Sequence, residues 1–265
     1  MDAAEAAWNL RVVSRTPPSA KFAEGGINSD LAFTGNYAIQ GNFNGYQVWD
    51  IANASRPTLK TPYVCPGSQS DVSVYQNLLF VSGENLAARL DCGAQGVEDT
   101  VSADRLRGLR IFDISDIAHP RNVGNVQTCR GSHTHTLLVD PKDRQNVYVY
   151  ISGQAPVRSP SELAGCVSAP KDPSSALFRI EVIKVPVAQP DQARIVSSPR
   201  IFTDLVAPPT HGDAPEDSVA EAKALAEAKA HGGFVGTFHG KEEVIHPMWV
   251  AELLDSTVKA RNGTG

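Results

Sequence analysis

No run of eighteen consecutive apolar residues occurs in this chain of 265 residues, so no segment of it is expected to span a bilayer as a helix. Residues 1–5 offer neither the basic region nor the apolar core of a signal peptide, as expected of an exported protein in its mature form. The 24 basic residues are outnumbered by 29 acidic ones, and no basic run is interleaved with aromatic residues. We therefore expect no nucleic-acid partner.

The sequence also lacks the common short motifs of catalysis. It contains no Gly-x-Ser-x-Gly elbow, no glycine-rich phosphate-binding loop and no His-Glu-x-x-His helix. Ser132 and His133 are adjacent on an expected strand, where neighbouring side chains point to opposite faces, so they do not form a catalytic pair. No catalytic residue is predicted.

What the chain does have is an internal repeat rich in strand and turn signals. Hydrophobic residues make up 42% of it, and 21 Gly and 18 Pro indicate many short elements, which favours an all-β fold. Three segments carry the same order of strand-like runs bounded by Gly, Asn, Asp and Pro. The runs are residues 29–33, 36–41, 45–51 and 58–64; then 70–74, 77–83, 108–114 and 122–128; then 134–138, 146–153, 177–182 and 193–202.

Four antiparallel strands per repeat predict β-propeller blades at residues 28–68, 69–131 and 132–202, after an N-terminal segment of residues 1–27. Residues 203–265 form a helical insertion or linker, with a helix at 213–231, a hairpin at 234–245 and a short helix at 249–260. A closed propeller needs at least about four blades. We therefore expect an incomplete ring, and favour a truncated chain over closure by another copy.

Two segments carry a resemblance to a known family. Gln47-Val48-Trp49-Asp50-Ile51 and residues 109–115, each followed by a turn that ends in Pro, resemble LVIVD repeats, which belong to exported or surface β-propeller proteins of bacteria and archaea. The resemblance covers roughly residues 28–202, and residues 129–135 are similar to longer bacterial members with further blades. It implies a propeller and an extracellular, cell-surface or periplasmic location, and it implies no established reaction.

The four cysteines follow the blade repeat. Cys65 and Cys129 each precede the first strand of a blade, and Cys92 and Cys166 each lie in the long insertion of that blade. This placement predicts the disulfides Cys65–Cys92 and Cys129–Cys166, each worth about 3 kcal/mol by closing a loop of roughly 30 residues. Four buried thiols in a reducing compartment are the alternative.

One polar position recurs where the first strand of each blade would line the central channel. Asp30, Asp71 and His135 occupy it, and His133 lies two residues earlier on the same strand face. Imidazole and carboxylate together could bind a divalent metal ion such as zinc, manganese or iron. In the alternative, the carboxylates bond backbone amides of neighbouring blades and the histidines are satisfied donors.

The carboxylates of the third strands are expected to have a structural role, and the two long insertions are candidates for binding. Asp50, Asp113 and Glu181 recur in the third strand and are expected to bond turn amides. The insertions at residues 84–107 and 154–175 are long enough to be functional. Two functions follow: a non-enzymatic exported scaffold that binds a protein or a glycan through these insertions, or a metal-dependent, oxidase- or hydrolase-like enzyme with its metal in the channel.

Overall fold

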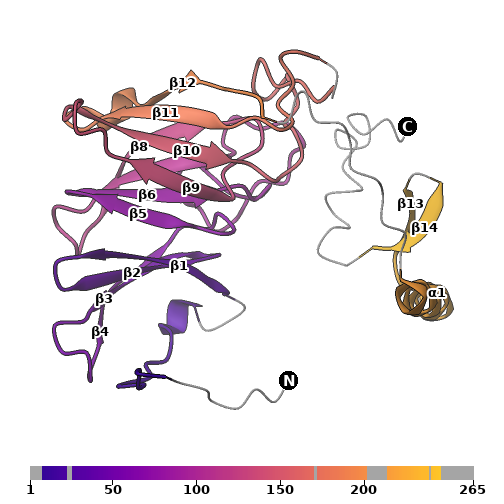
Figure 1. The fold of residues 1–265 in the computed structure, drawn as a ribbon, viewed down its shortest axis with the longest axis horizontal. Helices are drawn as coiled ribbons and strands as arrows, with labels where there is room; N and C mark the ends of the chain where they lie inside the picture. The colour runs from indigo at the N-terminus through magenta and orange to yellow at the C-terminus, as the bar shows by residue number, and fades with distance from the viewer. Residues whose placement is uncertain (1–7, 23–25, 170–171, 202–213, 239, 246–265) are drawn as a thin grey trace. The chain divides into compact units, whose positions relative to one another are not determined.

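The computed structural model describes residues 8–22, 26–169, 172–201, 214–238 and 240–245, and the chain divides into two units, residues 1–201 and 202–265. The first unit consists of three four-stranded antiparallel sheets, here called blades 1, 2 and 3 (Figure 1). Within each blade the strands lie side by side in chain order. This is the predicted all-β, propeller-type architecture of four-stranded blades.

The strands of each blade are joined by short turns or, in blades 2 and 3, by one long loop between the second and third strands. Blade 1 contains β1 (Asn28–Thr34), β2 (Tyr37–Asn42), β3 (Gly45–Asp50) and β4 (Thr58–Val64); blade 2 contains β5 (Val72–Tyr75), β6 (Leu78–Gly83), β7 (Gly108–Asp113) and β8 (Arg121–Gln127); blade 3 contains β9 (Thr134–Leu138), β10 (Asn146–Ser152), β11 (Glu181–Pro186) and β12 (Arg194–Ser197). Short 3-10 turns lie at Ala20–Phe22 and Pro190–Gln192.

Alternation along the strands explains why the blades stack. In β10, Val147, Val149 and Ile151 are buried on one face, whereas Tyr148 and Tyr150 point the other way and stay partly or well exposed. A strand in which apolar and more polar residues alternate turns its apolar residues to one face of the sheet, and this face becomes buried. The blades therefore pack face to face, as Figure 1 shows for β1–β12.

Two separate hydrophobic clusters hold the blades together. The first joins blades 1 and 2 and includes Ile39, Tyr46, Val48, Leu79 and Phe112. The second joins blades 2 and 3, and its fully buried members include Phe80, Leu109, Ile111, Val149 and Ile183. The odd and even residues of β7 thus point to different neighbours, which makes blade 2 the central layer of the three.

One predicted strand was placed wrongly. The third strand of blade 3 was expected at residues 177–182, but β11 begins at Glu181. Phe178 is 59% exposed and has a φ of 54°, a left-handed conformation that an aromatic residue in a strand does not adopt. The apolar residues before Glu181 therefore belong to the end of the preceding loop, and the alternating segment Val182–Val185 forms the strand.

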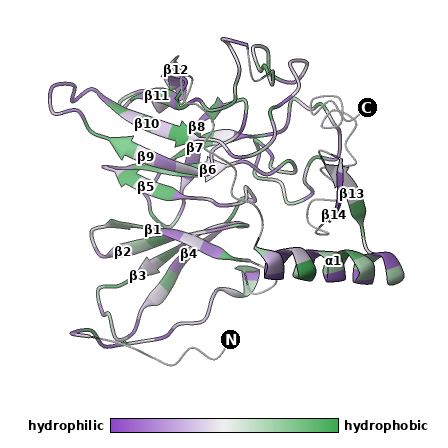
Figure 2. Ribbon diagram, turned by 45° about the vertical axis from the view of Figure 1, so that its right-hand side comes forward, coloured by the Kyte–Doolittle hydropathy of each residue, from purple (hydrophilic) through white to green (hydrophobic). Residues whose placement is uncertain are grey.

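The second unit contains one helix and one hairpin. Helix α1 (Pro215–Ala230) starts at a proline and has no buried residue. It ends shortly before Gly232, and this glycine has a left-handed conformation. Figure 2 shows hydrophilic and hydrophobic residues mixed along it. Strands β13 (Val235–Phe238) and β14 (Lys241–Val244) form the predicted hairpin. The short helix expected at residues 249–260 lies outside the described residues, and no described helix is long and apolar enough to cross a membrane.

Candidate functional site

The first strands of the three blades bring Asp30, Asp71 and His135 into one hydrogen-bonded chain, here called the inner-rim chain. Asp30 and Asp71 share a side-chain hydrogen bond between blades 1 and 2. The backbone amide of His135 donates to Asp71 Oδ2 at 2.6 Å between blades 2 and 3. Each contact crosses a blade boundary, so the recurring polar position links successive blades.

The side chain of His135 is fully buried between blades 2 and 3. The hydroxyl of Ser73 lies 2.7 Å from Nε2, and the hydroxyl of Ser82 lies 2.8 Å from Nδ1. Asp71 Oδ2 is 3.2 Å from Nδ1. Because burial disfavours the imidazolium, it lowers the pKa of His135 to about 4, so the ring is neutral at pH 7. A neutral imidazole has one donor and one acceptor, and these partners satisfy both.

The surroundings of Asp71 shift the ionisation of its carboxyl group. Burial, reinforced by the hydrogen bond with Asp30, raises the pKa of Asp71 to about 7, while the backbone amide of His135 acts in the opposite direction. Near neutral pH the carboxyl group of Asp71 is therefore partly protonated.

His133 has a different partner from His135. Its Nδ1 contacts Glu84 Oε1, and Glu84 is the first residue of the loop that follows β6. The backbone amide of Gln154, at the start of the corresponding loop in blade 3, lies 3.4 Å from Glu84 Oε2. Glu84 thus connects His133 to the two long loops, a role the sequence did not reveal because nothing in its spacing marks it.

For Asp71 and His135 the structure shows the contacts expected of the structural alternative: a carboxylate on a neighbouring backbone amide and a satisfied histidine. In the described part of the chain, no group of three or more His, Cys, Asp or Glu residues is arranged to hold a metal ion. The metal assignment for His133, His135, Asp30 and Asp71 stays a prediction.

The recurring carboxylates of the third strands do bond turn amides in blades 1 and 2. Asp50 Oδ1 accepts from the amide of Ala52, and Asp113 Oδ1 accepts from the amide of Ser115, each at 2.9 Å. Glu181, however, does not occupy the same position. Asp50 pairs with the first residue of β2, whereas the first residue of β10 pairs with Pro186. Glu181 instead binds Arg179 and Ser198.

Both predicted disulfides form, and each ties a long loop to a blade junction. Cys65 bonds to Cys92 in the β6–β7 loop (residues 84–107), and Cys129 bonds to Cys166 in the β10–β11 loop (residues 153–180). Val157 and Ala176 pack around the second disulfide in a small buried cluster. The two loops are therefore anchored beside their blades at both ends and near their middle.

A buried ion-pair cluster joins the two loops to each other. Glu162 of the β10–β11 loop contacts Arg105 of the β6–β7 loop and, at 2.6 Å, Nε of Arg158. The side chains of these three residues are 2–5% exposed. The amide of Ser102 also donates to Glu162, and Arg158 donates to Gln127 of β8. We call the two loops with this cluster the loop platform.

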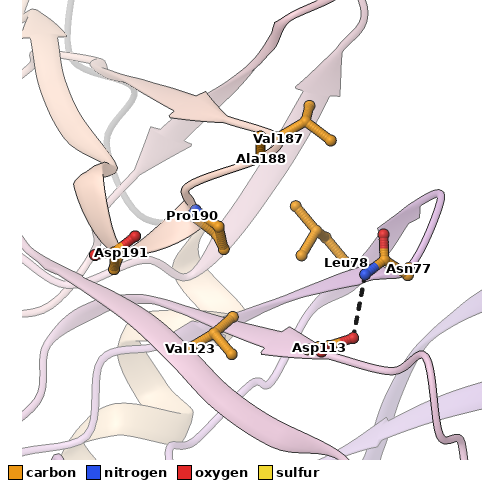
Figure 3. Close-up of a pocket in the computed structure, with 8 residues that line it drawn as sticks. All are labelled: Asn77, Leu78, Asp113, Val123, Val187, Ala188, Pro190 and Asp191. Carbon is orange, nitrogen blue, oxygen red and sulfur yellow. Dashed lines mark hydrogen bonds between the residues drawn. The ribbon is translucent and has the colours of Figure 1, made fainter.

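A groove of about 410 Å³ lies between blades 2 and 3, away from these residues (Figure 3). Its lining includes Leu78, Val123 and Pro190 with the carboxylates of Asp113 and Asp191. Asp113 is already engaged by Asn77, Ser115 and Arg121, and hydrogen bonds, chiefly from Ser115, hold its pKa well below its usual range. Its carboxylate serves the turn, so the groove has little free polar chemistry.

Comparison with known proteins gives a repeat match. The sequence model of the LVIVD repeat matches residues 25–64 and 103–128, which cover blade 1 and the last two strands of blade 2. No curated protein matches. Solved structures that match include a protein from Lactobacillus plantarum, with 17% identity over 68% of this chain and 58% of that one and a TM-score of 0.32.

Two further matches are more distant. The computationally designed Ika4 protein is 12% identical over 64% of this chain and 92% of its own, with a TM-score of 0.29. Apo AztD from Citrobacter koseri is 14% identical over 66% of this chain and 60% of its own, with a TM-score of 0.25.

Proposed function

We propose that this chain, which contains LVIVD repeats and β-propeller-type blades, is an exported, non-catalytic scaffold that binds a protein partner through the loop platform. The observation that carries the proposal is Glu162, which fastens the two long loops together through two buried arginines. Loops held in one arrangement before binding lose less conformational entropy when a partner docks. The two disulfides support work in an oxidising compartment.

Charge on the platform favours a partner with a basic contact surface. In the β6–β7 loop Asp91, Glu98, Asp99 and Asp104 are exposed. Arg89 pairs with Asp91 and Asp104, while Arg105 is buried against Glu162. Glu98 and Asp99 therefore form the acidic tip of the loop, next to Val101, which is 40% exposed. Surface charge of one sign steers a partner of the opposite sign during association.

A protein partner is favoured over a glycan by composition. Residues 84–107, which carry the acidic tip, contain no Phe, Tyr or Trp, so this loop presents no aromatic ring on which a sugar could stack. In the other loop Phe178, near its end, is the one aromatic residue. Acidic side chains and a small apolar contact suit a basic protein surface better. A glycan is the competing outcome of the test below.

The test is capture of envelope proteins from the source organism by the immobilised chain, with wild type beside Glu98→Lys/Asp99→Lys. The matched control is Glu216→Lys/Asp217→Lys, which makes the same charge change at exposed positions of α1. We expect one basic protein to be captured by wild type and control, to be lost with the tip variant, and to be released by salt. Equal capture by all three proteins, or binding to a glycan array that the tip variant retains, would refute the proposal.

The convergence of Asp30 and Asp71 favours a second candidate, a metal-dependent reaction at the inner rim. The two carboxylates, with His133, would supply oxygen and nitrogen ligands. Of the four candidate metal ligands, His135 is the least available to bind a metal ion, because serine hydroxyls contact both of its ring nitrogens. Metal content, measured by plasma mass spectrometry on protein purified without a histidine tag, tests this candidate.

A further inference from the structure

Arg110 lies in the middle of β7 and is fully buried between blades 1 and 2. Its Nη2 donates to the carbonyl oxygens of Pro66, at 3.0 Å, and Arg89, at 2.8 Å. Within the described part of the chain, its Nε and Nη1 atoms have no hydrogen-bond partner. A guanidinium has five N–H donors, so most of the donors of this buried group are unused.

The positive charge of Arg110 is also not balanced by any described carboxylate. Burial lowers its pKa to about 10, and the titratable neighbour that acts in the opposite direction is the phenol of Tyr63. The pKa of Tyr63 is itself raised, chiefly by burial, so that phenol is neutral at pH 7. Arg110 therefore remains a cation in a buried interface. Burial of an unpaired charge is strongly unfavourable, which calls for a counter-ion.

Two glycines lie beside Arg110, and the same interface contains a second unused donor. A Cβ atom at Gly67 would lie 2.6 Å from Nη1, closer than a Cβ atom can lie, so Nη1 fits beside this residue only because it has no side chain; a Cβ atom at Gly83 would lie 3.5 Å from Nη1, in ordinary contact. The hydroxyl of Tyr46 is buried in the same interface without a partner. Tyr46 packs edge-on against Phe112, two residues along β7 from Arg110.

We propose that the interface of blades 1 and 2 holds a small monovalent anion of halide size, bound by Arg110 Nε and Nη1. Both groups are donors without any acceptor capacity, and the Tyr46 hydroxyl adds a further donor. An anion accepts from all of them and balances the charge. A water molecule would balance no charge and would bring two hydrogens that need acceptors of their own.

The anion would also stabilise the loop platform. Arg110 holds the carbonyl of Arg89 in the β6–β7 loop and that of Pro66, the residue after Cys65. Balancing its charge strengthens the attachment of this loop beside the Cys65–Cys92 disulfide. The expected effect is a folded state whose stability depends on halide concentration.

The first experiment is anomalous diffraction, at the bromine absorption edge, from crystals of the wild-type chain soaked in sodium bromide. We expect an anomalous peak within hydrogen-bond distance of Arg110 Nη1. The second is thermal unfolding at constant ionic strength while bromide replaces gluconate, an anion much larger than a halide. Above the dissociation constant, each tenfold rise in bromide should raise the ratio of folded to unfolded wild-type protein tenfold.

Variants distinguish a specific site from a general salt effect. Arg110→Met should lose the bromide dependence, and Tyr46→Phe should weaken it. Lys60→Met, which removes an exposed positive charge from β4, should keep it. Absence of an anomalous peak, or equal bromide dependence in Arg110→Met and wild type, would overturn the proposal. If Arg110→Met does not fold, the crystal and Tyr46→Phe still decide it.

Discussion

Replacing Glu162 with Gln should loosen the loop platform more than any other single change in the two loops. Glu162 is the one acidic member of its cluster, and it contacts two arginines whose side chains are at most 5% exposed. Without the carboxylate, Arg105 and Arg158 would remain as two buried like charges. Removing one partner of a buried ion pair typically costs about 3–5 kcal/mol.

The way in which the two loops are attached determines which segments Glu162→Gln should destabilise. Arg105 also donates to carbonyl groups of its own loop, and Arg158 donates to Gln127 of β8. We therefore expect Glu162→Gln to lower the free energy of unfolding in urea by about 3 kcal/mol or more. Hydrogen exchange should quicken around residues 99–107 and 157–163, while the amides of β6 and β10 change less.

The matched control is Glu98→Gln, which removes an exposed carboxylate from the same platform and should cost less than about 0.5 kcal/mol. A second comparison is the triple variant Glu162→Leu/Arg105→Met/Arg158→Leu, which removes all three charges together. It should recover much of the loss, because apolar replacements of a complete buried cluster are often neutral. A loss below about 1 kcal/mol in Glu162→Gln, with unchanged exchange, would refute the reasoning.

Three further predictions concern the disulfides, the inner-rim chain and the metal. Cys129→Ser/Cys166→Ser should lower the free energy of unfolding by about 3–4 kcal/mol, because the lost disulfide closes a loop with a sequence separation of 37 residues. Chemical unfolding of this variant, and of the wild type before and after reduction, measures the loss. Because the native state raises the pKa of Asp71 to about 7, the contribution of this group to stability should be fully present below about pH 4 and should be lost as the pH rises to about 7. Asp71→Asn should remove this part of the pH dependence, which urea unfolding at a series of pH values measures. If the channel holds a metal ion, the wild-type protein should carry it stoichiometrically and His133→Ala/His135→Ala should not; equal metal content in both proteins would count against those histidines as ligands.

The blades could be predicted because each is a local pattern repeated along the chain. Strand β4 was expected at residues 58–64 and β9 at residues 134–138, and both have those bounds. The disulfides were predictable for the same reason, since Cys65 and Cys129 occupy equivalent places in successive blades. Where the repeat was least regular, before Glu181, an apolar stretch of loop was mistaken for the strand that follows it.

The loop platform could not be predicted, because its contacts join residues that share no repeat. Arg105 and Glu162 lie 57 residues apart in two insertions without periodic signals. Buried charges in a loop look the same in sequence as exposed ones. The unpaired guanidinium of Arg110 was missed for a related reason: in the pattern Leu109-Arg110-Ile111 it occupies a position that a surface arginine would occupy in a half-exposed strand.

The position of blade 2 has a mechanical consequence. Blade 2 contributes residues to both inter-blade clusters, whereas blades 1 and 3 contribute to one each. In a stack held by nearest-neighbour interfaces, unfolding can begin at either end and travel inwards, and each step opens one interface. Blade 2 would then be the last sheet to lose its order, and a force applied at the two ends of the stack would peel away the outer blades before it reached the layer on which both depend.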